Sequence, residues 1–134
     1  MASSPPGGIR FSRDRSISGP VIGGFSGRGF RVDDAVFSTG LMLTPEAALN
    51  WAAPAIADLD DHAVAPLLAL QPQAEFLLLG TGATLVRPSP AFVAALDARG
   101  MGCEAMDSRA AARAWGVLRA EGRWIAAALL PLDG

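Results

Sequence analysis

Glu75-Phe76-Leu77-Leu78-Leu79-Gly80-Thr81-Gly82 is a continuous apolar run that ends in two glycines flanking a threonine. An uninterrupted run of this length is typical of a strand buried on both faces, because a half-buried strand alternates apolar and polar residues. We therefore expect residues 76–79 to form a central strand of a sheet. The Gly-Thr-Gly stretch then forms the loop that follows its carboxyl end.

Helix and strand signals alternate after this run. Ser89-Pro90 is a helix start, because a serine cap is followed by proline at the first helical position. A short strand is predicted at residues 103–106, and Asp107-Ser108 caps a second helix. The last strand is predicted at residues 123–130. The order strand, helix, strand, helix, strand requires crossover connections and therefore a largely parallel core sheet.

One face of the second helix carries apolar residues at helical spacing, and we expect this face to be buried. Its members are Ala111, Ala114, Trp115 and Leu118.

The residue pattern of the N-terminal half is typical of an antiparallel β-meander. Apolar residues alternate loosely with glycine and polar residues over residues 17–43, and Asp33-Asp34 suits a hairpin turn. Residues 44–54 contain two prolines and read as a loop that lays Trp51 over the core. Asp60 or Asp61 then caps a short helix that runs to about Leu70, in which Pro66 is tolerated only in the first turn or at a kink. The predicted fold is thus α/β.

We predict one compact domain over residues 15–134. Its central sheet is mixed: helices link the parallel strands, and the antiparallel N-terminal meander is joined to the sheet. Residues 1–14 are rich in Ser, Pro, Gly and Arg, and we expect them to form a flexible tail.

Composition excludes several function classes. The chain has 134 residues, of which 51% are hydrophobic and 18% charged, and its net charge is −2. This balance does not fit a disordered polymer or a nucleic-acid binder. All 11 basic residues are arginine, and the chain has one Cys, one His and no Tyr. One such chain cannot assemble a disulfide framework, a zinc cluster or a Schiff-base lysine, so we expect no catalytic residues, metal or cofactor.

Targeting signals are weak. The longest uncharged apolar runs are about half of the roughly 20 residues that a membrane-spanning helix needs, and no transmembrane segment is expected. The N-terminus lacks the apolar stretch of a secretory signal, which favours a cytoplasmic location. Arg10, Arg13 and Arg15 among serines keep a mitochondrial transit peptide as the alternative. The single Cys103, expected in an interior strand, is predicted to be an inert small apolar residue.

A candidate binding crevice lies where two predicted strands end. Open α/β sheets bind ligands at the carboxyl ends of parallel strands. Gly80-Thr81-Gly82 follows one strand and Asp107-Ser108 another, so their backbone N–H groups, hydroxyls and carboxylate could line a site for an anion. Arg109 and Arg113 lie four apart on the second helix and could grip a phosphate or an acidic partner.

A purely structural interpretation is the alternative for these residues. The glycines then permit a tight turn, Asp107 or Ser108 caps its helix, and the two arginines form a solvated helix face. His62 follows two aspartates that could orient it as a general base, but such a histidine is more typical of a surface.

The ordered motifs resemble a known family. The matching blocks are Gly29-Phe30-Arg31-Val32-Asp33, residues 77–82, residues 104–111, and Leu118 with Glu121-Gly122-Arg123 before the apolar last strand. They resemble the small single-domain proteins that include mitochondrial complex I (NADH dehydrogenase) assembly factor 3. The resemblance implies a compact α/β domain with a mixed central sheet, no established enzyme activity, and a binding or chaperone-like role in assembling respiratory complex I. Relatives tend to carry Cys and then Tyr-Asn in the last helix, where this chain has Ala112 and then Trp115-Gly116.

Three functional hypotheses follow. The first is a non-enzymatic assembly or interaction protein whose partner is a protein, by analogy a subunit of complex I. The alternative is a small-molecule or anion-binding protein, with or without enzymatic activity, that uses the crevice at residues 80–82 and 107–108. The third is self-association through exposed strands of the meander. The sequence leaves the oligomeric state open.

Overall fold

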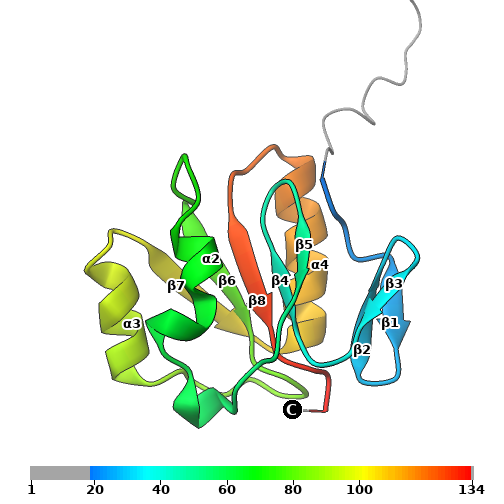
Figure 1. The fold of residues 1–134 in the computed structure, drawn as a ribbon, viewed down its shortest axis with the longest axis horizontal. Coiled ribbons are helices and arrows are strands. Elements are labelled where there is room, and N and C mark those ends of the chain that lie inside the picture. The colour runs from blue at the N-terminus through cyan, green and yellow to red at the C-terminus, as the bar shows by residue number, and fades with distance from the viewer. Residues whose placement is uncertain (1–18, 134) are drawn as a thin grey trace, which may run out of the picture.

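Two sheets organise residues 19–133, the part of the chain that this computed structural model describes (Figure 1). The tail expected at residues 1–14 lies outside the described residues. The first sheet is three-stranded and antiparallel in the order β1-β2-β3, with β1 at Gly24–Ser26, β2 at Gly29–Val32 and β3 at Ala35–Phe37. The predicted turn at Asp33-Asp34 joins β2 to β3, and Asp33 there adopts a φ of 52°.

The second sheet has five strands in the order β5-β4-β8-β6-β7. Its strands are β4 (Leu41–Leu43), β5 (Ala48–Asn50), β6 (Phe76–Gly80), β7 (Gly102–Met106) and β8 (Ala126–Leu129). Strand β6 pairs in parallel with both β7 and β8, whereas β4 pairs antiparallel with β8 and β5. The predicted α/β class, with a mixed sheet and an antiparallel N-terminal meander, is confirmed.

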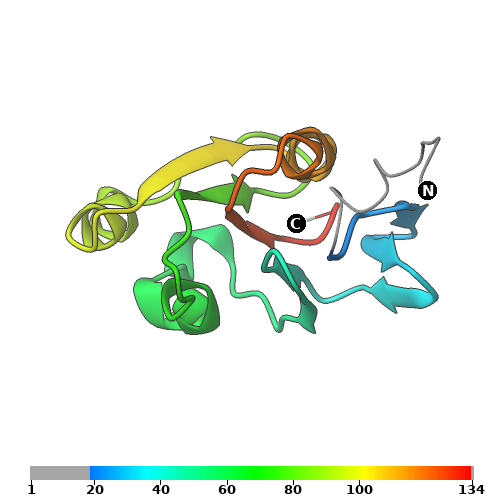
Figure 2. The same ribbon diagram turned by 90° about the horizontal axis from the view of Figure 1, so that it is seen from above.

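Helical segments cover both faces of this sheet, as Figure 2 shows from above. They are η1 (Ile56–Asp58), η2 (Asp61–Val64), α2 (Ala65–Leu68), α3 (Pro90–Asp97) and α4 (Ser108–Ala120). Alternate residues of β6 face opposite sides: Leu77 and Leu79 belong to the core under α2 and α3, and Leu78 to the core under α4. The apolar run therefore behaves as predicted, because both of its faces are buried.

The predicted helix starts are confirmed at their caps. The Ser89 hydroxyl accepts a hydrogen bond from the Phe92 N–H at 3.1 Å, with Pro90 in the first turn of α3. The Asp107 carboxylate accepts one from the Ala110 N–H at 2.9 Å and so caps α4. Asp60 caps η2, and Pro66 falls in the first turn of α2, where the missing N–H costs nothing.

Two strand predictions are corrected. Residues 48–50 form β5 rather than part of a loop, because the Thr44 hydroxyl accepts hydrogen bonds from the Glu46 and Ala47 N–H groups and closes a hairpin turn around Pro45. Strand β7, expected in the interior, is the edge of the sheet, since its only strand partner among the described residues is β6. The expected loop aromatic Trp51 does cover the core and is 5% exposed.

The buried face of α4 is also shifted from the predicted one. Ala111 and Trp115 are fully buried, but Ala112 and Arg119 are buried where Ala114 and Leu118 are only partly so. The Trp115 indole N–H donates to the Pro20 carbonyl at 2.9 Å, which ties the chain entering β1 to α4. The meander thereby packs beside α4 and widens the face that this helix must bury.

Gly116 provides a test of this helix. A glycine inside a helix lowers stability because it loses more backbone freedom on folding than alanine. A Cβ at Gly116 would meet no heavy atom within 4 Å. We expect Gly116→Ala to raise the free energy of unfolding by about 0.5–1 kcal/mol, measured by urea denaturation.

The matched control is Gly122→Ala. The Gly122 φ of +79° favours glycine, so alanine there should lower stability by about 1 kcal/mol although nothing crowds its Cβ. A loss of stability in Gly116→Ala would contradict the packing described for α4.

Candidate functional site

The carboxyl ends of β6, β7 and β8 meet at one edge of the five-stranded sheet. Gly80 at the end of β6 is in register with Met106 of β7 and Leu129 of β8. The loop after β6 and the start of α4 are therefore neighbours, joined by a hydrogen bond from the Ser108 N–H to the Gly82 carbonyl at 2.9 Å. The structure thus brings residues 80–82 and 107–108 together.

The Ser108 hydroxyl links three segments at this edge. It donates to the Leu130 carbonyl at 2.7 Å and accepts from the Gly82 N–H at 2.8 Å. The residue is completely buried. A Cβ at Gly80 would lie 2.8 Å from the Ser108 Oγ, so only glycine allows β6 and α4 to approach this closely. The hydroxyl therefore holds the strand ends together and is directed at protein backbone.

Thr81 is used in the same way. Its hydroxyl donates to the Thr84 carbonyl at 2.6 Å and accepts from the Val86 N–H at 3.0 Å, and its N–H donates to the Met106 carbonyl at 2.9 Å. The residue is 1% exposed. The side chains of Thr81, Asp107 and Ser108, which were expected to face an anion, therefore all bind backbone groups of the protein.

Arg109 and Arg113 lie away from this edge. Both are exposed on the outer side of α4, toward β1. The Arg109 guanidinium lies over the Phe25 ring, 5.5 Å from its centroid. Arg113 lines a shallow groove of about 270 Å³ between β1 and α4. The predicted set therefore divides into two places: five residues at the strand ends and two arginines on the helix surface.

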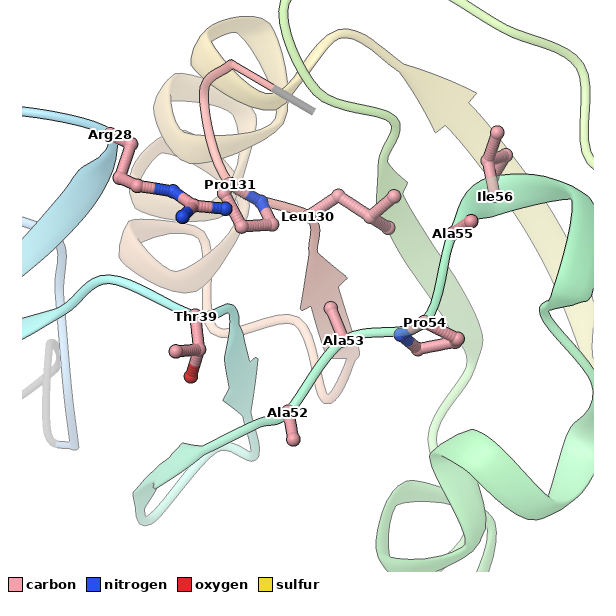
Figure 3. A pocket seen from close by; sticks show the side chains of 9 residues that line it. All are labelled: Arg28, Thr39, Ala52, Ala53, Pro54, Ala55, Ile56, Leu130 and Pro131. Atoms are coloured by element: carbon pink, nitrogen blue, oxygen red, sulfur yellow. The ribbon is translucent and has the colours of Figure 1, made fainter.

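Sequence reasoning missed an apolar cleft of about 520 Å³ next to the strand ends (Figure 3). Residues 52–56 form one wall, and Leu130 and Pro131 another. Its polar side chains have partners: the Arg28 guanidinium pairs with Asp133 at 3.2 Å, and the Thr39 hydroxyl donates to the Trp51 carbonyl at 2.9 Å. No motif could have revealed the cleft, because segments far apart in the chain line it.

A second apolar cleft of about 620 Å³ lies between α3 and β7. Cys103 contributes to its wall, with Leu85, Pro88 and Val93 among the neighbours. Burial above all, together with the nearby Glu104 and Asp97 carboxylates, raises the pKa of the Cys103 thiol to about 11. The thiol is therefore protonated at neutral pH, which agrees with the predicted inert character although β7 is an edge strand.

His62 does not assemble a general base with its neighbours in the described structure. It lines a small hollow of about 150 Å³ with Asp61 and Arg99. The Asp61 carboxylate is bound to the Arg99 guanidinium at 3.3 Å, and this hydrogen bond is the main reason that the pKa of Asp61 is lowered. Among residues 19–133, no group of three or more His, Cys, Asp and Glu side chains could hold a metal ion.

Comparison with known proteins places the chain in a family. The model of a family described as "protein of unknown function (DUF498/DUF598)" matches residues 22–130. The chain belongs to this family. An uncharacterized protein of Rhodobacter capsulatus is 38% identical over 91% of this chain and 94% of its own length. NADH dehydrogenase [ubiquinone] 1 alpha subcomplex assembly factor 3 of Danio rerio is 32% identical over 92% of this chain and 71% of its own length.

Similar solved structures agree with the architecture. A Bordetella pertussis protein described as an Mth938-like domain superposes with a TM-score of 0.76 and 26% identity, covering 94% of this chain and 93% of the other. The resemblance to the complex I assembly factor 3 family is thus confirmed. No helix in the described part of this chain is long and apolar enough to cross a membrane.

The linking role of Ser108 is testable by stability. Ser108→Ala leaves the buried Gly82 N–H and the Leu130 carbonyl without their partner, which should lower the free energy of unfolding by roughly 2–4 kcal/mol. Ser89→Ala is the matched control, because it removes a cap of α3 and should cost about 1 kcal/mol. Urea denaturation of both variants would contradict this role if Ser108→Ala cost no more than Ser89→Ala.

The raised pKa of Cys103 predicts slow thiol chemistry. The thiolate is the reactive form, and a pKa of about 11 instead of 9.0 leaves far less of it at pH 8. We expect Ellman's reagent to react with the folded chain roughly a hundredfold more slowly than with the urea-unfolded chain. The folded rate should rise with pH up to about 11. Equal rates in the two states would show that the thiol is neither buried nor shifted.

Proposed function

We propose that this chain is a protein-binding factor that assists the assembly of respiratory complex I. The observation that carries the proposal is the 32% identity to the Danio rerio assembly factor over 92% of this chain. The family model, which matches residues 22–130, covers both sheets and all the helices that enclose them, so the relationship is not limited to a shared motif. Named relatives in the family are assembly factors, which supports this role by family.

The described surface supports recognition of a protein more than chemistry on a small molecule. The hydroxyls of Thr81 and Ser108 bind backbone groups within the chain. The two larger apolar clefts lie open on the surface, and the polar side chains of the cleft in Figure 3 are paired internally. Apolar surface with a few charged groups at its rim is typical of protein interfaces. Anion binding at residues 80–82 and 107–108 stays a prediction, because the side-chain hydroxyls there already donate hydrogen bonds within the protein.

Deleting the gene from the source organism tests the proposal. We expect loss of fully assembled complex I and a fall in NADH-dependent quinone reduction by isolated membranes, because an assembly factor acts before the enzyme is complete. Native gels of membranes would show partially assembled species, and the wild-type gene supplied in trans should restore the full complex.

The control is another respiratory dehydrogenase, such as succinate dehydrogenase, in the same membranes. Its level and activity should stay unchanged. Normal amounts of assembled complex I in the deletion strain would overturn the proposed function, and an equal fall in both enzymes would point to a general effect on the membrane instead.

A further inference from the structure

A groove lies between β1 and α4, and hydrogen bonds hold the segment that forms its β1 wall. The β1 wall is held by the hydrogen bond from the Gly23 N–H to the Arg31 carbonyl at 2.8 Å, and the Trp115 indole ties the preceding Pro20 to α4. The groove has a volume of about 270 Å³. The residues that line it are Ile22, Gly23, Gly24, Phe25, Ala112, Arg113 and Gly116.

Small residues form the floor of this groove. A Cβ at Gly24 or at Gly116 would meet no heavy atom of the protein within 4 Å, so the space above both backbones is open. Gly116 in particular lies inside α4, where glycine lowers helix stability. Because Gly116 has no side chain, the groove has room for a side chain of another molecule.

The rim of the groove is basic. Arg109 and Arg113 are exposed and lie one helical turn apart on the same side of α4. Neither forms an ion pair with another residue of the described chain, whereas Arg28, Arg99 and Arg123 each pair with a carboxylate. Two guanidinium groups with free donor capacity therefore face solvent here, although the chain as a whole carries a net charge of −2.

Apolar surface accompanies these charges. Phe25 is 38% exposed under the Arg109 guanidinium, and Val117, which follows Arg113 by one turn, is 60% exposed. A surface that combines an apolar floor with two guanidinium groups is complementary to an amphipathic segment rather than to a free anion.

We propose that the β1–α4 groove binds an acidic amphipathic helix of a protein partner. Two carboxylates four residues apart on that helix match the spacing of Arg109 and Arg113, and an aliphatic side chain between them enters the space above Gly24 and Gly116. Guanidinium groups bind carboxylates through paired hydrogen bonds, which gives the contact both strength and orientation. This inference rests on the proposed function for the class of partner, which is a protein.

A designed peptide tests the groove directly. The probe is an 18-residue helical peptide, blocked at both ends, with Glu pairs four residues apart beside a leucine stripe. Titrated into the isotope-labelled full chain, it should shift the amide resonances of Gly23, Gly24 and Gly116. A control peptide in which every Glu is replaced by Lys should leave these resonances unchanged, because its lysines repel Arg109 and Arg113.

Three variants define the residues involved. Arg109→Glu combined with Arg113→Glu should weaken peptide binding by at least about tenfold, since it replaces both attractive contacts by repulsive ones. Gly116→Gln should weaken it by about fivefold, because its side chain fills the floor. Arg87→Glu is the matched control: this exposed arginine on the loop before α3 also lacks an ion pair among the described residues, and its reversal should change binding less than twofold.

The outcomes separate the groove from the proposed function. The groove inference is overturned if the Lys probe binds as well as the Glu probe, if the shifts lie elsewhere, or if the double reversal binds normally while circular dichroism shows it folded. It is also overturned if light scattering shows a dimer of the chain that the double reversal dissociates and the peptide does not.

In the deletion strain, the double reversal should fail to restore complex I. Full restoration by it would overturn the groove inference and leave the proposed function standing. A deletion without effect on complex I would remove the proposed function, and the peptide titration would then decide the groove alone.

Discussion

Burial of β6 and β8 on both faces is the constraint on which the rest of the structure depends. Leu77, Leu78 and Leu79 are each at most 1% exposed, and the β8 residues Ala126–Leu129 are fully buried. A sheet with two apolar faces needs a covering layer on each. Strand β8 lies on the opposite side of β6 from β7, so α4, which joins β7 to β8, must cross β6 and covers one face. The η2–α2 segment and α3 cover the other (Figure 2).

Local signals explain which parts of the fold could be predicted. The strand at residues 76–80 could be predicted from its own run of apolar residues, and the caps at Ser89 and Asp107 depend on hydrogen bonds to residues three positions away. The β4–β5 hairpin was missed because its turn contains Pro45 and its second strand is only three residues long. The edge position of β7 depends on strand order, which pairs residues far apart and leaves no local pattern. Arg119 is buried although it is charged, and its guanidinium donates to the Arg123 carbonyl four residues further along the chain.

The candidate site likewise has features that the sequence predicts and features that depend on residues far apart in the chain. The proximity of residues 80–82 and 107–108 follows from parallel strands ending at one edge, which the order of elements implies. The hydrogen-bond partners of their hydroxyls do not follow from the order of elements, because the Ser108 Oγ binds the backbone of Leu130, 22 residues away, and of Gly82, 26 residues away. Sequence spacing likewise placed Arg109 and Arg113 on one side of a helix, but it could not place β1 against them.

The contrast between polar groups that are satisfied at the strand ends and arginines without ion-pair partners on the described surface supports the proposal that recognition takes place on the outside of this fold. At the strand ends, Gly80 packs closely against Ser108, and the Thr81 and Ser108 hydroxyls bind backbone groups of the protein itself. On the outer side of α4, the same chain leaves open space above Gly116, an exposed Phe25 edge and two arginines without carboxylate partners among the described residues. A helix stabilised by its buried Trp115 face can tolerate a glycine and like charges on its exposed face, because tertiary packing supplies most helical stability. The buried face of α4 therefore supplies the stability of this helix, and its exposed face is available for the partner binding that we propose.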